Sequence, residues 1–233
     1  MVQLGKNPLV ALAIKDDNFE ETLELSKEYG VDVVELRVDQ LSDLSVDYVR
    51  ILSNQIKQRG FHLLITIRSL LEGGGREIPD TDRLKIFESI VDIADILDIE
   101  FTSDGIRENV IELAKSRGKL SLVSYHDFEK TPSEEFIQNY IDSVKSLGAD
   151  IVKFAFRANK LEDVANILCI THRNRDKNIV AIAMGEVGKI SRVAGFVFGS
   201  LMTYTYIGDA FAPGQIEASQ LIEELKFYRI KED

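Results

Sequence analysis

Two short apolar runs decide the fold: Leu120-Ser-Leu-Val-Ser-Tyr-His-Asp127 and Asp150-Ile-Val-Lys-Phe-Ala-Phe156. Runs of this length and composition are typical of buried strands. A helix-like segment at residues 132–147 lies between them and can serve as the crossover that joins two parallel strands. The stretch therefore predicts one strand–helix–strand unit of a parallel sheet.

The same alternation extends along the chain in both directions. Eight strands are predicted, at Leu9–Ile14, Val33–Val38, Phe61–Arg68, Ile96–Phe101, Lys119–His126, Asp150–Ala155, Ile179–Met184 and Leu201–Tyr206. Amphipathic helices are predicted between and after them, at residues 18–29, 45–59, 80–94, 104–117, 132–147, 160–174, 188–198 and 216–229. Four glycines stand where helix C-terminal caps are expected: Gly30, Gly60, Gly118 and Gly148.

Eight strand–helix units without a long linker favour an α/β fold of the closed (β/α)8 type, a TIM barrel that spans residues 1–233 as a single domain. A doubly wound open sheet is the alternative, but such a sheet normally uses fewer strands. In a TIM barrel the chemistry takes place at the carboxyl ends of the strands. The residues at those ends are therefore the candidates for a functional site.

The chain is acidic, with 28 lysines and arginines against 39 aspartates and glutamates and a net charge of −11. This balance argues against binding to nucleic acid, whereas a small anionic substrate fits if a few arginines gather in one pocket. No apolar run reaches about 18 residues, so we expect no membrane span. Residues 1–8 lack the apolar core of a signal peptide.

The single cysteine, Cys169, excludes an intramolecular disulfide. It lies in an apolar helical stretch, which predicts a small core residue rather than a reactive thiol. We therefore expect a reducing compartment and a cytoplasmic location.

The strongest chemical signal is a lysine inside one predicted strand and a histidine at the end of the strand before it, Lys153 and His126. Burial disfavours an ammonium ion, so we expect the pKa of Lys153 to fall and its amine to become nucleophilic. His126 can transfer protons near neutral pH, and the pair indicates Schiff-base chemistry on a carbonyl. His62 lies at the wrong end of its strand and His172 in a polar helix end, so no metal site is predicted.

Charged residues also end the other predicted strands. Glu35 and Arg37 share one face of their strand, where they either form an ion pair at the barrel mouth or bind a ligand. Arg68 ends its strand and precedes a glycine run at residues 73–75, which indicates an anion or hydroxyl ligand under a loop, or else a plain surface loop. Glu100 is interpreted as a structural partner for a nearby cation.

Two further features belong to the last strands of the predicted barrel. Arg192 falls near the start of a helix, where backbone N–H groups also favour anions. Pro213 and Gly214 force a turn that would present the Gln215 amide to a ligand.

Six motifs then occur in a family's order: Glu35-Leu-Arg-Val-Asp39, Arg68-Ser-Leu-Leu-Glu-Gly-Gly74, Ser124-Tyr-His-Asp-Phe128, Val152-Lys-Phe154, Gly188-Lys-Ile-Ser-Arg-Val-Ala-Gly195 and Ala212-Pro-Gly-Gln-Ile216. Through them the chain resembles the type I 3-dehydroquinate dehydratases over nearly its whole length. The resemblance implies a (β/α)8 barrel that dehydrates 3-dehydroquinate to 3-dehydroshikimate in the shikimate pathway of aromatic amino acid biosynthesis. It also implies a Schiff base without cofactor or metal, and a homodimer.

The resemblance assigns a role to each candidate residue. Lys153 would attack the ring ketone, and His126 would remove a proton and later protonate the departing hydroxyl. His126 would also help form and hydrolyse the imine, and Glu72 would orient His126 or tune its charge. Arg192 and Gln215 would hold the substrate carboxylate. The remaining substrate-binding candidates are Glu35, Arg37 and Arg68 around the ring hydroxyls or the lysine, and Met184 as an apolar wall or as ordinary barrel core.

One position departs from the family pattern. Phe211 stands where the family usually has a serine two residues before the proline, so it either turns away or packs over the substrate. Two alternatives to the dehydratase stay open from the residues alone. One is a Schiff-base aldolase, which would normally need a phosphate site, and the other is a barrel that binds an anion without catalysis.

Overall fold

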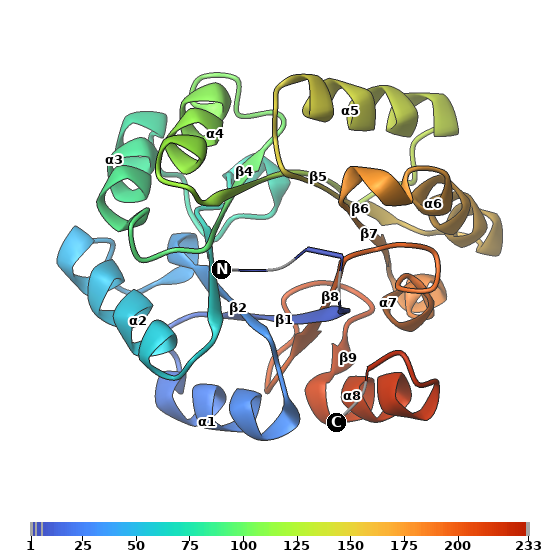
Figure 1. The fold of residues 1–233 in the computed structure, drawn as a ribbon, viewed down its shortest axis with the longest axis horizontal. Coiled ribbons are helices and arrows are strands. Elements are labelled where there is room, and N and C mark those ends of the chain that lie inside the picture. Colours follow the sequence, from blue (N-terminus) through green and yellow to red (C-terminus); the bar gives the residue numbers. More distant parts are fainter. Residues whose placement is uncertain (1, 3, 6, 232–233) are drawn as a thin grey trace.

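Eight parallel strands form the wall of a barrel in the computed structural model of the protein, which describes residues 2, 4–5 and 7–231. These strands are β1 (Leu9–Ile14), β2 (Val33–Arg37), β3 (His62–Thr66), β4 (Ile96–Glu100), β5 (Leu120–Asp127), β6 (Ile151–Arg157), β7 (Ile179–Met184) and β8 (Met202–Tyr206). Helices ring the outside of the strands (Figure 1). The predicted (β/α)8 barrel is confirmed, and the doubly wound alternative is wrong because helices do not cover both faces of the sheet.

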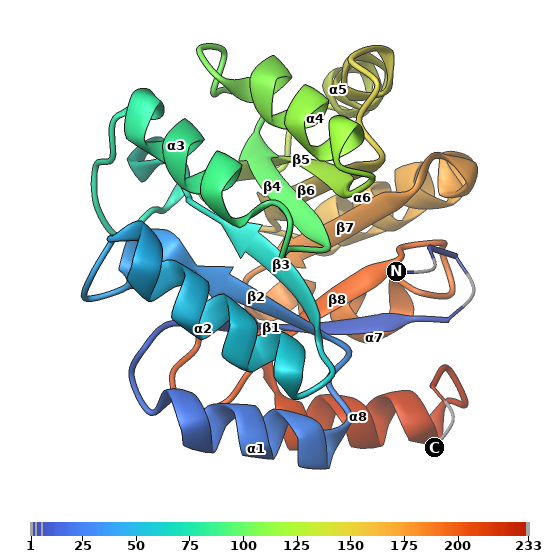
Figure 2. The same cartoon turned by 60° about the vertical axis from the view of Figure 1, so that its left-hand side comes forward.

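The principal helices are α1 (Phe19–Tyr29), α2 (Val46–Gln58), α3 (Asp80–Ile90), α4 (Arg107–Ser116), α5 (Glu134–Ser146), α6 (Leu161–Arg173), α7 (Ser191–Ala194) and α8 (Ala218–Phe227). Short 3₁₀ turns are η1 (Val38–Gln40), η2 (Leu70–Glu72), η3 (Arg175–Lys177) and η4 (Glu186–Gly188). The first and last helices, α1 and α8, lie side by side and bring the two ends of the barrel sequence together (Figure 2).

The helix predicted at residues 188–198 is much shorter than expected, because α7 spans only Ser191–Ala194. Gly195 still has right-handed helical dihedrals, and the chain continues in turns up to Gly199. Gly199 has a φ of 100°, which a right-handed helix cannot accommodate, and there the chain turns toward β8.

The barrel closes unevenly. The backbone ladders run in the order β7-β6-β5-β4-β3-β2-β1-β8-β9, so β7 and β8 share no ladder. A single backbone bond, from the Leu201 N–H to the Ile179 carbonyl at 2.8 Å, links the starts of these two strands. The short β9 (Ile216–Glu217) pairs with the end of β8. It was not predicted, because two residues are too few to show the alternation of apolar and polar side chains that marks a strand.

Two apolar layers hold the barrel together. The outward side chains of the strands pack under the helices, as Leu36 and Phe154 do, in a cluster that includes the inner faces of α2 and α5. A second cluster fills the amino-terminal end of the barrel interior with residues such as Leu64, Leu122 and Ile151. Val2 is buried in that cluster, and Leu4 packs against it.

Cys169 is exposed on α6, so the prediction of a core position is wrong. The buried face of that helix is formed by Val164, Ile167 and Ile170, and Cys169 lies outside this spacing. Its neighbours in sequence are apolar, which hid the difference between the two helix faces.

The middle of the barrel interior is polar rather than apolar. Because side chains alternate along a strand, one residue from each of five adjacent strands points inward at this height. These residues are Glu35, Thr66, Asp98, Ser124 and Lys153, and all are buried. The layer sits between the apolar amino-terminal end and the barrel mouth, so it forms the bottom of any site at the mouth.

The loop after β8 is fixed to the end of β7 by a close approach of two glycines. The Gly185 N–H donates to the Pro213 carbonyl at 3.1 Å. Gly214 has a φ of 73°, and a Cβ added there would lie 2.3 Å from the Gly185 carbonyl oxygen. Only glycine fits this contact, which brings the 207–215 loop over the barrel mouth.

Gly214→Ala should therefore destabilise the protein more than Gly208→Ala. Gly208 lies in the same loop with a φ of 77°, but a Cβ there meets nothing within 4 Å. We expect about 1–2 kcal/mol for the left-handed backbone in either variant, and roughly 1–3 kcal/mol more in Gly214→Ala for the collision. Thermal unfolding measures the difference. Equal melting temperatures would contradict the close approach.

Candidate active site

All nine predicted site residues line one cavity at the carboxyl ends of the strands. They are Glu35, Arg37, Arg68, Glu72, His126, Lys153, Met184, Arg192 and Gln215. Side chains that the sequence did not single out for this cavity complete its wall, among them Phe128, Ile182 and Tyr204. The strand ends and the family motifs thus predicted residues that lie around one cavity. The sequence alone did not distinguish the aromatic residues of its wall from ordinary core residues.

Lys153 lies at the bottom of this cavity, inside the barrel, and is only 4% exposed. Its Nζ donates to Asp98 Oδ2 at 3.1 Å and lies 4.0 Å from Glu35 Oε1. The same nitrogen stands 4.4 Å from the centre of the Tyr204 ring, a cation–π distance. The amine is therefore held by groups from three other strands.

The expected fall in the pKa of Lys153 is wrong. Burial does favour the neutral amine, but the nearby carboxylates of Asp98 and Glu35 outweigh it and raise the pKa above its ordinary value. The resting form is therefore an ion-paired ammonium. The sequence could not show this, because Asp98 is 55 residues away in the chain.

Asp98 is a site residue that the sequence reading missed. It is fully buried, and it accepts hydrogen bonds from Arg68 at 2.8 Å, from the Ser124 hydroxyl at 2.6 Å and from Lys153. Burial alone would raise the pKa of Asp98, but the charges of Arg68 and Lys153 hold it well below its usual range. The signal was present in the sequence, since Asp98 is a charge inside an apolar strand, as Lys153 is.

Arg68 is engaged by buried carboxylates rather than free for a ligand. Besides Asp98, it donates to Glu100 Oε1 at 2.9 Å. Glu100 also pairs with Arg83 and accepts from the Ser103 hydroxyl at 2.7 Å, which agrees with its interpretation as a structural partner. The result is a buried network in which each charge has an opposite neighbour.

The possible ion pair between Glu35 and Arg37 is not formed. Arg37 instead binds Asp39 through two parallel hydrogen bonds of 3.0 and 2.8 Å. Glu35 accepts from the Thr66 hydroxyl and faces Lys153. The guanidinium and the carboxylate thus have separate partners at the cavity wall.

His126 and Glu72 form a closely bonded pair. Glu72 Oε2 lies 3.0 Å from His126 Nδ1 and also accepts from the His126 backbone N–H at 2.9 Å, while the Thr102 hydroxyl donates to the other carboxylate oxygen. Burial raises the pKa of Glu72 to about 7, against the opposing hydrogen bond from Thr102.

The imidazole of this pair is neutral. Burial and the charges of Arg68 and Lys153 hold the pKa of His126 well below its usual range. An ionised Glu72 accepts the Nδ1–H, which leaves Nε2 with a free lone pair. A neutral imidazole in this tautomer can act as a general base.

Arg192 is a buried cation without an acidic partner in the described part of the chain. It is 2% exposed, and it donates to the carbonyls of Gly214 at 2.7 Å, Tyr204 at 3.2 Å and Pro213 at 3.4 Å. Burial lowers the pKa of Arg192 to about 10, so it stays charged at neutral pH. A buried charge of this kind is stabilised by an anion that enters the cavity.

Gln215 organises the loop that carries this site. Its Oε1 accepts from the backbone N–H groups of Phe211 at 2.7 Å and Ala212 at 3.1 Å. Its Nε2 donates to the Thr205 carbonyl at 3.4 Å, which leaves a second amide proton for a ligand. The predicted turn thus holds the amide at the cavity wall.

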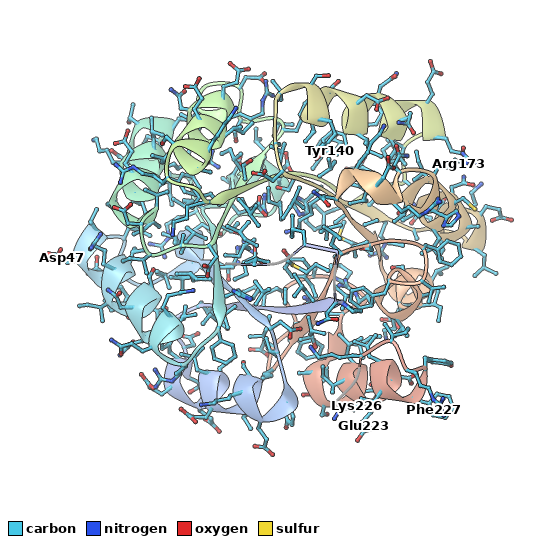
Figure 3. All side chains as sticks on the ribbon, in the orientation of Figure 1. Asp47, Tyr140, Arg173, Glu223, Lys226 and Phe227 are labelled. Carbon is cyan, nitrogen blue, oxygen red and sulfur yellow. The ribbon has the colours of Figure 1, made fainter. Side chains whose placement is uncertain are left out.

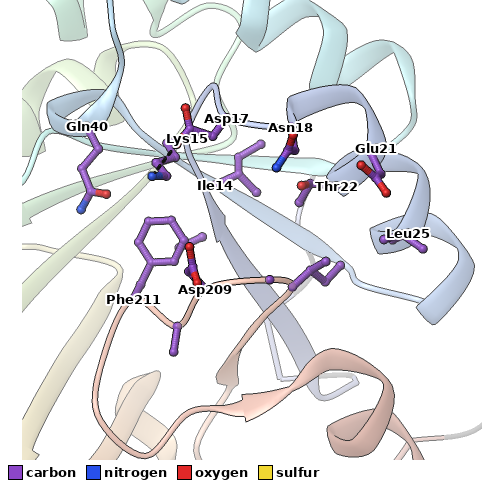
Figure 4. Close-up of a pocket in the computed structure, with 14 residues that line it drawn as sticks. Ile14, Lys15, Asp17, Asn18, Glu21, Thr22, Leu25, Gln40, Asp209 and Phe211 are labelled. Carbon is purple, nitrogen blue, oxygen red and sulfur yellow. Dashed lines mark ion pairs between the residues drawn. The ribbon is translucent and has the colours of Figure 1, made fainter.

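Phe211 lies between the cavity and a second, outer pocket. Its ring is 5.9 Å from the Arg37 guanidinium and lines both spaces. Figure 4 shows the outer pocket, where the β1–α1 segment with Lys15 and Asp17 faces the loop with Asp209 and Phe211. Phe211 is therefore an aromatic partition between the two spaces.

Among the described residues, no group of three or more histidine, cysteine, aspartate or glutamate side chains is arranged to hold a metal ion. In that same part of the chain, no helix has both the length and the apolar character needed to cross a membrane.

Comparison with known proteins identifies a family. The family model described as type I 3-dehydroquinase matches residues 10–232. The 3-dehydroquinate dehydratase of Aquifex aeolicus is 43% identical over 223 residues, which cover 95% of this chain and all of the relative.

Solved structures give the same result. The crystal structure of the Aquifex aeolicus enzyme aligns with a TM-score of 0.86 and 42% identity over 95% of this chain and 99% of that one. The type I 3-dehydroquinate dehydratase of Clostridium difficile, solved with covalently modified comenic acid, aligns with a TM-score of 0.89 and 26% identity over 100% and 96% of the two chains.

The Tyr204 hydroxyl is buried at this site and has no hydrogen-bond partner among the described residues. Tyr204→Phe should therefore leave the free energy of unfolding unchanged or raise it by up to about 1–2 kcal/mol. Tyr140→Phe is the matched control, because the Tyr140 hydroxyl lies 2.9 and 2.8 Å from the carbonyls of Val123 and Lys153. Figure 3 shows Tyr140 between α5 and the strands.

Tyr140→Phe should cost roughly 1–3 kcal/mol, because it leaves buried carbonyls without their donor. Denaturant unfolding of both variants measures the contrast. A loss of stability in Tyr204→Phe as large as in Tyr140→Phe would show that the Tyr204 hydroxyl is bonded.

Proposed function

Because this chain belongs to the type I 3-dehydroquinase family, we propose that it dehydrates 3-dehydroquinate to 3-dehydroshikimate through a Schiff base on Lys153. One observation carries the proposal. The same cavity is lined by a buried lysine, Lys153, and by a buried arginine, Arg192, that has no carboxylate partner among the described residues. That combination fits a substrate with a ketone and a carboxylate. The expected place of the reaction is the shikimate pathway, which supplies aromatic amino acids.

The reaction begins at the Lys153 nitrogen. The resting ammonium first gives up a proton, for which the neutral His126 in the same cavity is the available base. The free amine adds to the ring ketone, His126 passes its proton to the hydroxyl of the resulting carbinolamine, and loss of water gives an iminium ion beside a neutral imidazole. The positive nitrogen then withdraws electrons and acidifies the adjacent C–H bond.

His126 carries the proton steps that follow. Its Nε2 removes the proton next to the iminium carbon and returns a proton to the departing hydroxyl, which leaves as water. Water then adds to the product iminium with His126 as the proton carrier, and cleavage of the C–N bond releases the ketone product and restores the Lys153 amine. Glu72 holds the ring through Nδ1 and stabilises the imidazolium that forms. Since the pKa of Glu72 is raised to about 7, the pair can take up or release a proton near neutral pH.

The remaining residues bind and position the substrate. Arg192 gives the substrate carboxylate a charge-assisted bond, and Gln215 adds its free amide proton. Glu35 is the carboxylate nearest to Lys153 on the cavity wall and can accept from a ring hydroxyl. Three other candidates also line the cavity: Arg37, Arg68 and Met184. The two arginines hold the neighbouring carboxylates Asp39 and Asp98 in place through their ion pairs, and Met184 is a buried wall residue.

Membership of the family favours the dehydratase over the aldolase and over a non-catalytic anion-binding barrel. Catalysis without external cofactor or metal, a homodimeric assembly and a cytoplasmic location belong to the same proposal. The family resemblance supports all three, and the single cysteine also fits a reducing location.

Lys153→Ala should abolish covalent capture of the substrate, because no amine is left to form the imine. His126→Ala should still form the imine but lose turnover by roughly 10²–10⁴, the usual contribution of a general base. Borohydride reduction with 3-dehydroquinate, followed by peptide mass spectrometry, measures the adduct, and absorbance of the enone product measures turnover. Normal turnover in Lys153→Ala would refute the mechanism.

Arg192→Ala should weaken substrate binding, with KM raised roughly 10–100-fold, as expected for the loss of a hydrogen bond to a charged group. The control is Arg173→Ala, since Arg173 is an exposed arginine at the outer rim of the molecule (Figure 3). Steady-state kinetics measure both variants. An unchanged KM in Arg192→Ala would remove this residue from carboxylate binding.

A further inference from the structure

The Lys153 amine has a partner below the substrate cavity that the steps above do not use. Asp98 is 0% exposed and does not line the cavity, yet its carboxylate lies 3.1 Å from the reacting nitrogen. Asp98 is itself held by Arg68 and Ser124 at 2.8 and 2.6 Å. It is therefore a fixed negative charge on the side of the nitrogen opposite the cavity.

The charge on that nitrogen changes during the proposed reaction. An ammonium becomes a neutral amine, then an iminium after water leaves. Removal of the adjacent proton gives a neutral enamine, and departure of the hydroxyl restores the iminium. An iminium withdraws electrons only while its nitrogen stays protonated, so a group that favours the positive form accelerates the central proton transfer.

We propose that Asp98 is the counterion of the Lys153 nitrogen and keeps the Schiff base protonated while His126 removes the adjacent proton. This inference rests on the proposed function, since it concerns an intermediate of that reaction. The contact with the reacting nitrogen makes Asp98 a catalytic residue.

Geometry favours Asp98 over Glu35 for this role. The Glu35 carboxylate is farther from the nitrogen, at 4.0 Å against 3.1 Å, and it lines the cavity where the substrate binds. Asp98 keeps two other donors, Arg68 and Ser124, when the nitrogen becomes neutral. It therefore stays ionised through the enamine stage and can stabilise the second iminium.

The other charges around Asp98 determine how strongly its carboxylate favours the protonated nitrogen. Arg68 shares the same carboxylate and limits its pull on the nitrogen, so that the iminium can still become an enamine. Around the nitrogen and this ion pair stand four further titratable groups from the neighbouring strands: Glu35, Glu100, His126 and Tyr204. Of the carboxylates, only Asp98 and Glu35 lie within 4.0 Å of Nζ among the described residues.

The test compares Asp98→Asn with Glu100→Gln. Both changes neutralise a buried carboxylate on β4 that binds Arg68, but of these two carboxylates Asp98 is the one that pairs with Lys153. Removing the counterion lowers the pKa of the amine and of the imine. The fall of kcat on the alkaline side of its pH profile should therefore begin at least about one pH unit lower. We also expect Asp98→Asn to lose roughly 100-fold in kcat while borohydride still captures the imine on Lys153.

Glu100→Gln can lose activity through Arg68 but should keep the native alkaline limb, and Asp98→Glu should restore part of the shift. A native alkaline limb in Asp98→Asn, or the same shift in Glu100→Gln, would overturn the inference.

A measurement on the unaltered protein decides the point if Asp98→Asn does not fold. The C=N stretch of the unreduced imine in the native protein, recorded by Raman spectroscopy in H₂O and D₂O, reports whether the imine nitrogen carries a proton. A deuterium shift that persists into the mildly alkaline range supports the inference, and its loss near neutral pH refutes it. Absence of any imine in the native protein would instead refute the proposed function, and the counterion with it.

Discussion

Charges placed inside the barrel must be neutralised from within, and this constraint shapes the whole active site. A lone buried carboxylate or guanidinium is costly, so the charges at the bottom of the site are paired with opposite charges. Arg68 meets this need by bridging Asp98 and Glu100, and Asp98 in turn holds Lys153. The network fixes the nucleophile in place before any substrate arrives, because no member can move without exposing another charge.

Arg192 is the exception, and the contrast is informative. The other buried cations of the interior have carboxylate partners, whereas Arg192 has only backbone carbonyls in the described chain. In the proposed function, the negative charge of the substrate carboxylate is that partner. The same loop that supplies these carbonyls also carries Phe211 and Gln215, so the anion site and the wall over it belong to one segment.

Much of this arrangement could be predicted from sequence, because it depends on the alternation of apolar strands and amphipathic helices, which short stretches of sequence reveal. The alternation of strands placed Lys153, His126 and Arg68 at one end of the barrel without knowledge of any contact. The sign of the pKa shift at Lys153 could not be predicted, because it depends on a carboxylate from another strand. Asp98 was overlooked although it shares the signal that singled out Lys153, a charge within an apolar strand.

The apolar layer at the amino-terminal end of the barrel has a consequence for the flow of molecules through the enzyme. Among the described residues, the apolar cluster that includes Val2 and Leu4 fills that end, and the cavity lies at the opposite end of the barrel. In the proposed reaction, substrate would enter and product and water would leave through that opposite end. Product that stays bound at the proposed carboxylate site would exclude the next substrate molecule, so inhibition by product is an expected consequence of this architecture.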